Sequence, residues 1–336
     1  MARLKMGVAT ETLRLVEPFR IAGHVFEDVD ALVVTLSDGA HRGRGEAAGV
    51  YYLNDDLPEM LAALDGARDA VEAGPTRKEL RRLLPPGGAR NAVDCALWEL
   101  EAARSGRPVW ALAGLPEPRP LRTTFTVGAG APEDMATKAQ KFAHAKSIKV
   151  KLTGDLDLDL ERVRAIRAAR PDVWLGVDGN QGFAADALDL LVAGLRAHDV
   201  SLLEQPLARG READLDGFNS PIPIAGDESL LSLKDLASAP GRFDVVNIKL
   251  DKCGGLTEGL MMAAEARRLG LGVMVGTMVG TSLATAPGFV LGQLADLVDL
   301  DGPTFLAADR SPSVTYEGGE LFAGPGVWGS PQAVPA

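Results

Sequence analysis

The pattern of apolar and polar positions along the chain changes its period near Thr123. Beyond this point, short apolar runs rich in β-branched residues alternate with segments whose apolar residues recur every three or four positions, as in 158–171 and 256–270. Strands that alternate with helices are typical of βαβ units in a parallel sheet. The runs are TFTVGAG (124–130), SIKVKL (147–152), VWLGVDGN (173–180), VSLLEQP (200–206), IPIAGDES (222–229), FDVVNIKL (243–250), LGVMVGTM (271–278) and ADLVDLDG (295–302). Strands of this number and order predict an α/β fold closed into a TIM-type barrel.

The first 120 residues follow a different pattern. Two runs with strand-like alternation, 8–16 and 30–39, precede helical stretches around 56–74 and 88–106. Strands followed by helices predict an α+β domain, and the Gly/Pro-rich segment 113–123 links it to the barrel. The expected division is an N-terminal α+β capping domain at 1–120, a catalytic barrel at 121–311, and a C-terminal tail at 312–336 that packs back on the capping domain.

Composition favours a globular protein that acts on small molecules. The 336 residues are 46% hydrophobic and 24% charged, and the net charge of −11 offers no basic surface for nucleic acid or an anionic membrane. The two cysteines, Cys95 and Cys253, are too few for a disulfide framework and fit a reducing cytoplasm. No segment reaches the ~18 consecutive apolar residues of a membrane span. We therefore expect a cytoplasmic homo-oligomer with neither nucleic-acid nor membrane partners.

Three successive predicted strands each end in a carboxylate, namely Asp178, Glu204 and Asp227. The carboxyl ends of barrel strands carry the active site, and three carboxylates that converge there would repel one another unless a cation joined them. Oxygen ligands of this kind suit Mg²⁺. Singly, each residue could instead cap a helix or pair with an arginine, but their occurrence on consecutive strands favours a metal site. Nearby, Asn180 is expected to orient a ligand, and Glu228 to support the site or cap a helix.

Lysines occupy the second and sixth strands of the same predicted barrel. Lys149 and Lys151 project to one face, because strand residues two apart share a face. Lys249 ends the sixth strand, so Lys151 and Lys249 are expected on opposite walls with the carboxylates between them. Repulsion between neighbouring ammonium groups predicts a lowered pKa for one of them, which suits a base. An isolated KVK would instead suit a solvated edge strand, and Lys249 alone could lie at a rim.

These residues together give the sequence a resemblance to the enolase superfamily, in the muconate lactonizing enzyme subgroup. The KVK pair, the three carboxylates and the Lys249 strand carry the resemblance over nearly the whole barrel. It implies a modified (β/α)₇β barrel under an α+β capping domain, with Mg²⁺ bound by the carboxylates. It also implies that Lys151 or Lys249 removes the α-proton of a carboxylate substrate, that Mg²⁺ and Lys149 stabilise the enediolate, and that the other lysine returns a proton.

The eighth strand, in VDLDGP, favours one group within that subgroup. Asp299 and Asp301 are two apart, so both are expected to point into the site, where a pair of carboxylates suits an ammonium group. The D-x-D resembles that of the dipeptide epimerases, and the run 295–312 is similar to the Ala-Glu epimerases. The resemblance implies a Mg²⁺-dependent isomerase of the EC 5.1.1 type that inverts the C-terminal residue of a dipeptide. The expected pair is L-Ala-D-Glu and L-Ala-L-Glu, as in the recycling of cell-wall peptide.

Other interpretations of the same residues stay open at the level of sequence. Another lysine-pair enzyme, such as an N-acylamino acid racemase or a muconate cycloisomerase, would leave Asp299 and Asp301 without an ammonium partner. One of these aspartates could cap the turn before Gly302. A barrel that only binds a ligand would not need lysines on opposite walls, and the carboxylate triad disfavours a Schiff-base aldolase that uses Lys249.

Side-chain specificity is expected to depend on segments outside the barrel strands. The segment EPFRIAGHVFEDVD (17–30) is expected to be a capping-domain loop that closes over the substrate. Within it, Arg20 or His24 could meet a terminal γ-carboxylate. Met278, in GTMVGTS (276–282), is expected to line the substrate pocket near the seventh strand.

Overall fold

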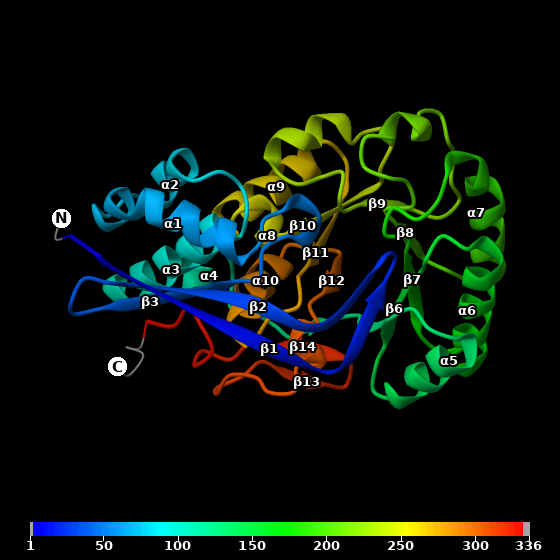
Figure 1. Ribbon diagram of the computed structural model, residues 1–336, viewed down its shortest axis with the longest axis horizontal. Helices are drawn as coiled ribbons and strands as arrows, with labels where there is room; N and C mark the ends of the chain where they lie inside the picture. The colour runs from blue at the N-terminus through cyan, green and yellow to red at the C-terminus, as the bar shows by residue number, and fades with distance from the viewer. Residues whose placement is uncertain (1–2, 332–336) are drawn as a thin grey trace.

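A computed structural model of the protein describes residues 3–331 and has two parts (Figure 1). The N-terminal part contains an antiparallel sheet, and the larger part contains a parallel sheet of eight strands. This confirms the predicted fold class, a TIM-type barrel with an N-terminal α+β domain. Within the described residues, no helix is both long and apolar enough to cross a membrane.

The antiparallel sheet begins with a hairpin of two long strands, β1 (Lys5–Ile21) and β2 (His24–Ser37). The strands pair as far as their tip, where the turn contains Gly23 at φ +70°. The prediction that 17–30 is a loop is therefore wrong, because this segment is the distal half of the hairpin. Pro18 and the charged residues at 27–30 hide the alternation of the strand in the sequence.

A third strand, β3 (Arg42–Ala47), was not predicted from the hydrophobic pattern. Its sequence, RGRGEA, has low strand propensity because glycine offers no side chain to pack. The glycines instead let α3 (Gly88–Ser105) approach the backbone of the sheet. A Cβ atom at Gly45 would lie 2.1 Å from the carbonyl oxygen of Ala92. The sheet and α3 therefore pack backbone to backbone at this point.

Gly45→Ala is expected to lower the free energy of unfolding by about 1–3 kcal/mol, because the added methyl group would meet backbone atoms that cannot rotate away. Urea denaturation measures this change. Gly7→Ala on β1 is the matched control, since a Cβ atom there would meet Thr35 Cβ at an ordinary 3.8 Å. Equal stability of the two variants would mean that α3 can move away from the sheet without cost.

Helices complete the N-terminal part. The Asp56 side chain accepts a hydrogen bond from Glu59 N at the start of α1, and Thr76 and Glu79 form a capping box on α2. The α3 helix ends at Gly106, whose φ is +67°. The elements besides α3 are the 3₁₀ helix η1 (Tyr51–Leu53), α1 (Leu57–Glu72), α2 (Arg77–Leu83) and α4 (Val109–Leu112).

The eight parallel strands follow one another in sequence order around the larger part, so their carboxyl ends lie at one side. They are β5 (Phe125–Val127), β6 (Ser147–Lys151), β7 (Trp174–Asp178), β8 (Leu202–Glu204), β9 (Ile224–Gly226), β10 (Val245–Lys249), β11 (Gly272–Gly276) and β12 (Leu297–Asp299). Thr124 N donates to Val298 O at 3.0 Å, and Leu300 N donates to Thr123 Oγ1 at 3.0 Å. These hydrogen bonds join the first and last strands and close the barrel.

Helices cover the outside of the barrel, with α5, α6 and α7 forming its outer layer in Figure 1. Ile148 and Val150 belong to the apolar cluster that contains Val163 and Ile166 of α6, so these two residues face the helices. The residues of β6 that alternate with them therefore face the barrel interior. The helical elements are α5 (Pro132–Lys141), α6 (Leu156–Ala169), η2 (Ala185–Ala187), α7 (Leu188–Ala197), η3 (Glu212–Leu215), η4 (Leu233–Ser238), α8 (Leu250–Cys253), α9 (Leu256–Arg268), α10 (Ser282–Gly292) and η5 (Gly302–Phe305).

The chain beyond Arg310 returns to both parts of the molecule. β13 (Thr315–Glu317) and β14 (Glu320–Phe322) form a small sheet with β4 (Leu121–Arg122). Farther on, Trp328 Nε1 donates to Arg44 O at 2.9 Å, and Gly329 N donates to Glu99 Oε1 at 3.2 Å. Of the predicted tail, residues 332–336 lie outside the described residues.

Buried polar contacts hold the N-terminal part against the barrel. Arg90 on α3 donates to Glu258 on α9 at 2.7 Å, and both side chains are buried. Arg310 donates to the buried Glu46 of β3, also at 2.7 Å, and Thr281 N donates to the same glutamate at 2.8 Å. Because an unpaired buried charge is costly, these pairs fix how the N-terminal part sits over the barrel mouth.

Candidate active site

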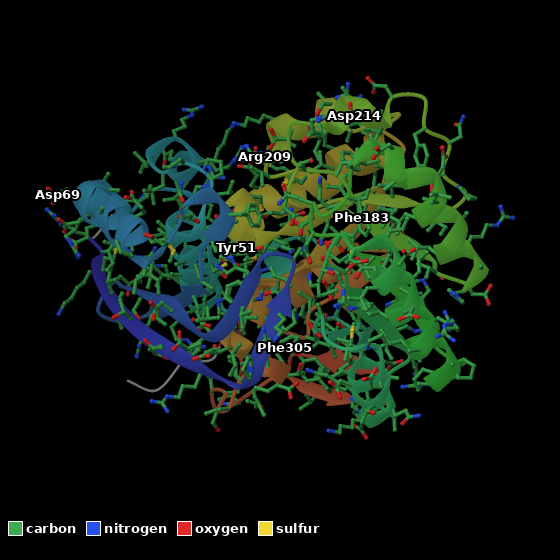
Figure 2. All side chains as sticks on the ribbon, turned by 45° about the vertical axis from the view of Figure 1, so that its right-hand side comes forward. Tyr51, Asp69, Phe183, Arg209, Asp214 and Phe305 are labelled. Atoms are coloured by element: carbon green, nitrogen blue, oxygen red, sulfur yellow. The ribbon has the colours of Figure 1, made fainter. Side chains whose placement is uncertain are left out.

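A cavity of about 420 Å³ lies where the N-terminal part meets the carboxyl ends of the barrel strands. Hydrophobic side chains of the hairpin and η1 line it from one side, among them Phe19, Phe26 and Tyr51. The barrel lines it with charged side chains from strand ends and, after β12, with Phe305. Figure 2 shows Tyr51 and Phe305 beside the distal half of the hairpin. We call the side formed by the hairpin and η1 the apolar wall, although two aspartates of β2, Asp28 and Asp30, also line it, and the side formed by the strand ends the charged wall.

The predicted carboxylates Asp178, Glu204 and Asp227 come together at the charged wall. Asp178 ends β7 and is in register with Glu204 at the end of β8, while Asp227 directly follows β9. All three residues are at most 1% exposed. One oxygen atom from each lies within 4.8 Å of the others. No other such trio was found in residues 3–331.

The donor set of this cluster fits Mg²⁺. It offers only carboxylate oxygens, which are hard ligands of the kind that Mg²⁺ prefers. Glu204 Oε2 is buried and accepts no well-directed hydrogen bond from the described residues, although Lys149 Nζ lies 2.7 Å away. Burial raises the pKa of Glu204, and the charge of Asp178 raises it further. A divalent cation would relieve this repulsion between carboxylates.

The three predicted lysines surround the carboxylate cluster and line the cavity. Lys151 Nζ lies 2.7 Å from Asp178, and Lys249 Nζ lies 2.7 Å from Asp227. Since β6 and β10 are four strands apart in an eight-stranded barrel, these two lysines lie on opposite walls. Lys149 Nζ lies between them and contacts Asp178, Glu204 and Asp299 at 2.7–3.1 Å.

Carboxylates, more than repulsion between the lysines, set the pKa of Lys149 and Lys249. Burial lowers the pKa of Lys149, but the carboxylates around it, of which Asp299 has the largest effect, raise the pKa well above its ordinary value. Burial likewise lowers the pKa of Lys249, but Asp227, together with Glu204 and Glu228, raises it above its ordinary value. Attraction by carboxylates therefore outweighs repulsion between lysines. The same lysines, Lys151 most strongly, bring the pKa of Asp178 down to about 2 despite its burial.

Asp299 and Asp301 both line the cavity, but they make different contacts. Asp299 accepts hydrogen bonds from Lys149 Nζ at 2.8 Å and from the Thr124 hydroxyl. Asp301 accepts one from Thr126 N at 2.6 Å. Burial, and then the charge of Asp299, raise the pKa of Asp301 to about 7. Asp301 is therefore the more available of the two for an incoming cation.

Asn180 and Glu228 lie together at the edge of the cluster. Asn180 N donates to Asp178 Oδ1 at 2.9 Å, and Asn180 Nδ2 donates to Glu228 Oε1 at 3.4 Å. Burial, and then the charge of Asp227, raise the pKa of Glu228 to about 8. Asn180 Oδ1 and Glu228 Oε2 are buried and accept no hydrogen bond from the described part of the chain. Both residues line the cavity, so these two atoms remain available to a ligand.

Of the three residues expected to select the substrate side chain, Met278 lines the cavity and the other two do not. Met278 lines the cavity, as Phe19 does. Arg20 is exposed and lies outside the set of residues that line the cavity, because successive strand residues point to opposite faces. This geometry does not support the prediction that Arg20 meets a γ-carboxylate. The ring centroids of His24 and Tyr51 lie 4.7 Å apart. Tyr51 lines the cavity, whereas His24 does not.

Three polar residues that support the carboxylates were missed in the sequence. Asn247 Nδ2 donates to Glu204 Oε1 at 2.8 Å, and Gln205 Oε1 accepts from Asp227 N at 3.0 Å. Lys252 Nζ donates to Asp227 Oδ1 at 2.6 Å. Asn247 could have been found, because it lies two residues before Lys249 and shares its face of the strand.

The fold and the site together define the class of the protein, which is an enzyme of the enolase superfamily. Residues 5–114 match the mandelate racemase / muconate lactonizing enzyme N-terminal domain, and residues 134–322 match the enolase C-terminal domain-like family. The chain therefore belongs to the mandelate racemase / muconate lactonizing enzyme family, as the resemblance predicted.

Individual relatives are epimerases. The chain is 40% identical over 316 residues to the L-Ala-D/L-Glu epimerase of Escherichia coli, covering 94% of this chain and 98% of the relative. A solved structure from Agrobacterium tumefaciens, an enolase family member with homology to dipeptide epimerases, has bound sodium and L-Ala-L-Glu. It is 39% identical with a TM-score of 0.93, covering 97% of this chain and 100% of that chain. A dipeptide epimerase of Methylococcus capsulatus in complex with Mg and L-Arg-D-Lys is 30% identical with a TM-score of 0.89, covering 96% and 97%.

Proposed function

We propose that the protein is a Mg²⁺-dependent dipeptide epimerase that inverts the α-carbon of the C-terminal residue, with L-Ala-D-Glu and L-Ala-L-Glu as the substrate pair. The observation that carries the proposal is one cavity lined by Lys151 and Lys249 from opposite sides of the barrel and by Asp301, with the carboxylate trio between the lysines and its member Asp227 reaching the cavity. A substrate with a carboxylate at one end and an ammonium group at the other matches this order of charges.

The two facing lysines would move the proton. A carboxylate substrate held at the trio would place its α-carbon between Lys151 on β6 and Lys249 on β10. Mg²⁺ held by the trio would offset the carboxylates that raise the pKa of Lys249, so that an amine on one side of the barrel can be neutral and take the α-proton. The ammonium group on the other side delivers a proton to the opposite face of the α-carbon. Neither lysine can reach both faces, so inversion requires both of them.

The groups around the α-carbon would stabilise the charge that develops when the proton leaves. Mg²⁺ held by Asp178, Glu204 and Asp227 would supply divalent charge that offsets the buried carboxylates and stabilises negative charge on the substrate carboxylate. Lys149 adds a positive charge at the same place, since its Nζ contacts two of these ligands. The hairpin and η1 line the other side of the cavity.

Proton exchange in D₂O tests the proposed function. L-Ala-L-Glu with MgCl₂ is expected to lose the NMR signal of its C-terminal α-proton while the D epimer appears. N-acetyl-L-Ala-L-Glu and N-acetyl-L-Glu are the comparison substrates, because neither carries the free amine that Asp301 is proposed to bind. Exchange of the acetylated compounds without exchange of free dipeptides would instead establish an N-acylamino acid racemase.

Asp301→Asn is expected to lower kcat/KM for free dipeptides roughly 10- to 150-fold. This decrease corresponds to about 1.5–3 kcal/mol, which is the loss of a charge-assisted hydrogen bond. The asparagine keeps the shape of the side chain and removes its charge. The loss is expected to be much smaller for N-acetyl dipeptides, and comparison of the two kcat/KM values measures it. Equal losses for both substrates would make the role of Asp301 structural.

Asp299→Asn provides a contrast on the same strand. Since Asp299 contacts Lys149 directly, its substitution is expected to slow turnover of free and acetylated dipeptides alike.

Finer features of the function are also proposals. We infer action on cell-wall peptide, because a free Ala-Glu dipeptide is a fragment of that polymer. A cytoplasmic location is supported by Cys95 and Cys253, which are both buried free thiols. Size-exclusion chromatography with light scattering tests the proposed homo-oligomer.

A further inference from the structure

Lys252, in the short helix α8 that follows Lys249, has a buried ammonium group. Its side chain is 0% exposed. Four oxygens lie within hydrogen-bond distance of the three N–H donors of Nζ, namely Asp227 Oδ1 at 2.6 Å, Asp227 O at 2.6 Å, Asn247 O at 2.9 Å and Leu230 O at 3.2 Å. Two of the four belong to one residue, so Lys252 bridges the side chain and the backbone of Asp227.

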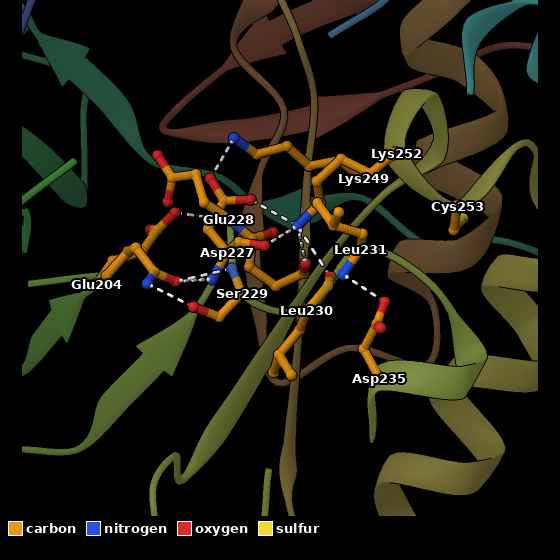
Figure 3. Close-up of polar contacts among 12 residues, drawn as sticks. Glu204, Asp227, Glu228, Ser229, Leu230, Leu231, Asp235, Lys249, Lys252 and Cys253 are labelled. Atoms are coloured by element: carbon orange, nitrogen blue, oxygen red, sulfur yellow. Dashed lines mark hydrogen bonds and ion pairs between the residues drawn. The ribbon is translucent and has the colours of Figure 1, made fainter. Parts of the chain in front are cut away.

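This bridge lies behind the cluster, on the side away from the cavity. Figure 3 shows the contacts of Lys252 with Asp227 and Leu230, and Lys249 on another side of the same aspartate. Lys249 Nζ contacts the second oxygen, Oδ2, at 2.7 Å. Lys249 and Asp227 line the cavity, whereas Lys252 is not among the residues that line it. Lys252 therefore has no path to a substrate.

Besides the lysines that line the cavity, each carboxylate of the trio has one further donor, and these donors differ in kind. Asp178 Oδ1 accepts from a backbone N–H, that of Asn180, and Glu204 Oε1 accepts from the amide of Asn247. Asp227 is held by a full positive charge that also binds its own carbonyl oxygen. A contact to both groups restricts rotation of the Asp227 side chain about its first torsion.

We propose that Lys252 is a positioning residue for the metal centre, which fixes the orientation of the Asp227 carboxylate that would hold the ion. The inference rests on the proposed function, in which Asp227 is a ligand of Mg²⁺. Groups that orient metal ligands from behind commonly change metal affinity by about 10- to 100-fold. We expect an effect of this size for Lys252.

The sign of the effect separates positioning from simple electrostatics. A positive charge near a cation site repels the cation, so removal of the ammonium group by itself would tighten Mg²⁺ binding. Loss of orientation would weaken it. Weaker binding after removal of Lys252 can therefore only come from a misplaced Asp227 or from general disruption of α8.

Calorimetric titration with MgCl₂, without substrate, is the experiment. Lys252→Met keeps the length of the side chain and removes its charge and donors, and it is expected to raise the Kd for Mg²⁺ at least about tenfold. Asp251→Asn is the matched control on the same helix. Asp251 is buried and accepts from Ala48 N of the N-terminal part at 3.1 Å. The Kd of Asp251→Asn for Mg²⁺ is expected to stay within about twofold of the wild-type value. Thermal melts of both variants are recorded in parallel.

The remaining outcomes are decisive. An unchanged or lower Kd for Lys252→Met, or equal increases in Lys252→Met and Asp251→Asn, would overturn the positioning role. Should Lys252→Met fail to fold, the milder Lys252→Gln, which retains N–H donors for the carbonyl groups, decides by the same titration, with an increase of at least fivefold expected. Asp227→Asn distinguishes the underlying proposal, because an Asp227→Asn protein that binds Mg²⁺ like the wild type would refute the metal site itself.

Discussion

Lys249→Ala is expected to abolish epimerisation in both directions while leaving exchange of one epimer intact. A positioned base contributes about 10²–10⁴-fold, and the lysine that remains on the facing wall cannot reach the other side of the α-carbon. The surviving Lys151 would still wash deuterium into the isomer whose α-proton points toward β6. NMR of L-Ala-D-Glu and L-Ala-L-Glu in D₂O, each incubated separately with the variant, measures both quantities.

Lys151→Ala is expected to show exchange of the other isomer. Lys146→Ala serves as the control, because Lys146 is an exposed lysine that pairs with Glu320 at 3.1 Å, away from the cavity. It should epimerise at the wild-type rate. If either Lys151→Ala or Lys249→Ala exchanged both isomers at comparable rates, a one-base mechanism would replace the two-base mechanism.

Asp178→Asn or Glu204→Gln is expected to reduce turnover by at least about 10³-fold, because each removes a charged ligand and with it several kcal/mol of stabilisation of the developing carboxylate charge. The fold is expected to persist in Glu204→Gln, because this substitution relieves the repulsion that raises the pKa of Glu204. Melts also check the fold of Asp178→Asn, which loses ion pairs with Lys149 and Lys151. Wild-type protein treated with EDTA should lose activity to the same extent and regain it with MgCl₂.

Thermal melts distinguish loss of the metal from loss of the fold. Mg²⁺ should raise the Tm of the wild type, since an ion that binds only the native state stabilises it, and should not raise the Tm of Asp178→Asn. Asp172→Asn, at an exposed residue that pairs with Arg170, is the control and should respond to Mg²⁺ like the wild type. Full activity after exhaustive dialysis against EDTA would contradict metal dependence.

The barrel and its charged wall could be predicted because the order of the strands and the residues at their ends can be identified in the sequence. Each strand is a short apolar run, and the residue at its end is polar. Parallel pairing brings those ends to one side, as with Lys151, Asp178 and Glu204 on adjacent strands. The prediction therefore needed only the order of the strands and no side-chain geometry.

The apolar wall could not be predicted in the same way. The hairpin is half solvated near its tip, where Pro18 and several charged residues obscure the alternation, and β3 consists of glycine, charged residues and one alanine. Its glycines are explained by the close approach of α3, which is a tertiary contact with no local signature. The orientation of Arg20 depended on the same unrecognised strand.

The chemistry behind the charged wall was also hidden. Lys252, three residues after the proposed catalytic Lys249, would be expected at the surface from the sequence, since lysine is rarely buried. Only the fold shows that Lys252 has four oxygen neighbours. Likewise, the raised pKa values of Lys149 and Lys249 depend on carboxylates from other strands, which an argument from the KVK pair alone does not include.

The residues that line the two walls of the cavity come from separate segments of the chain. The proposed proton-transfer and metal groups lie on barrel strands, while Phe19, Ile21, Phe26 and Tyr51 lie on the hairpin and η1. We therefore expect substitutions within residues 19–51 to change the preferred substrate while the proposed proton-transfer and metal groups stay in place. For directed evolution, randomising the hairpin positions that face the cavity is a small library, and it leaves every proposed catalytic group in place.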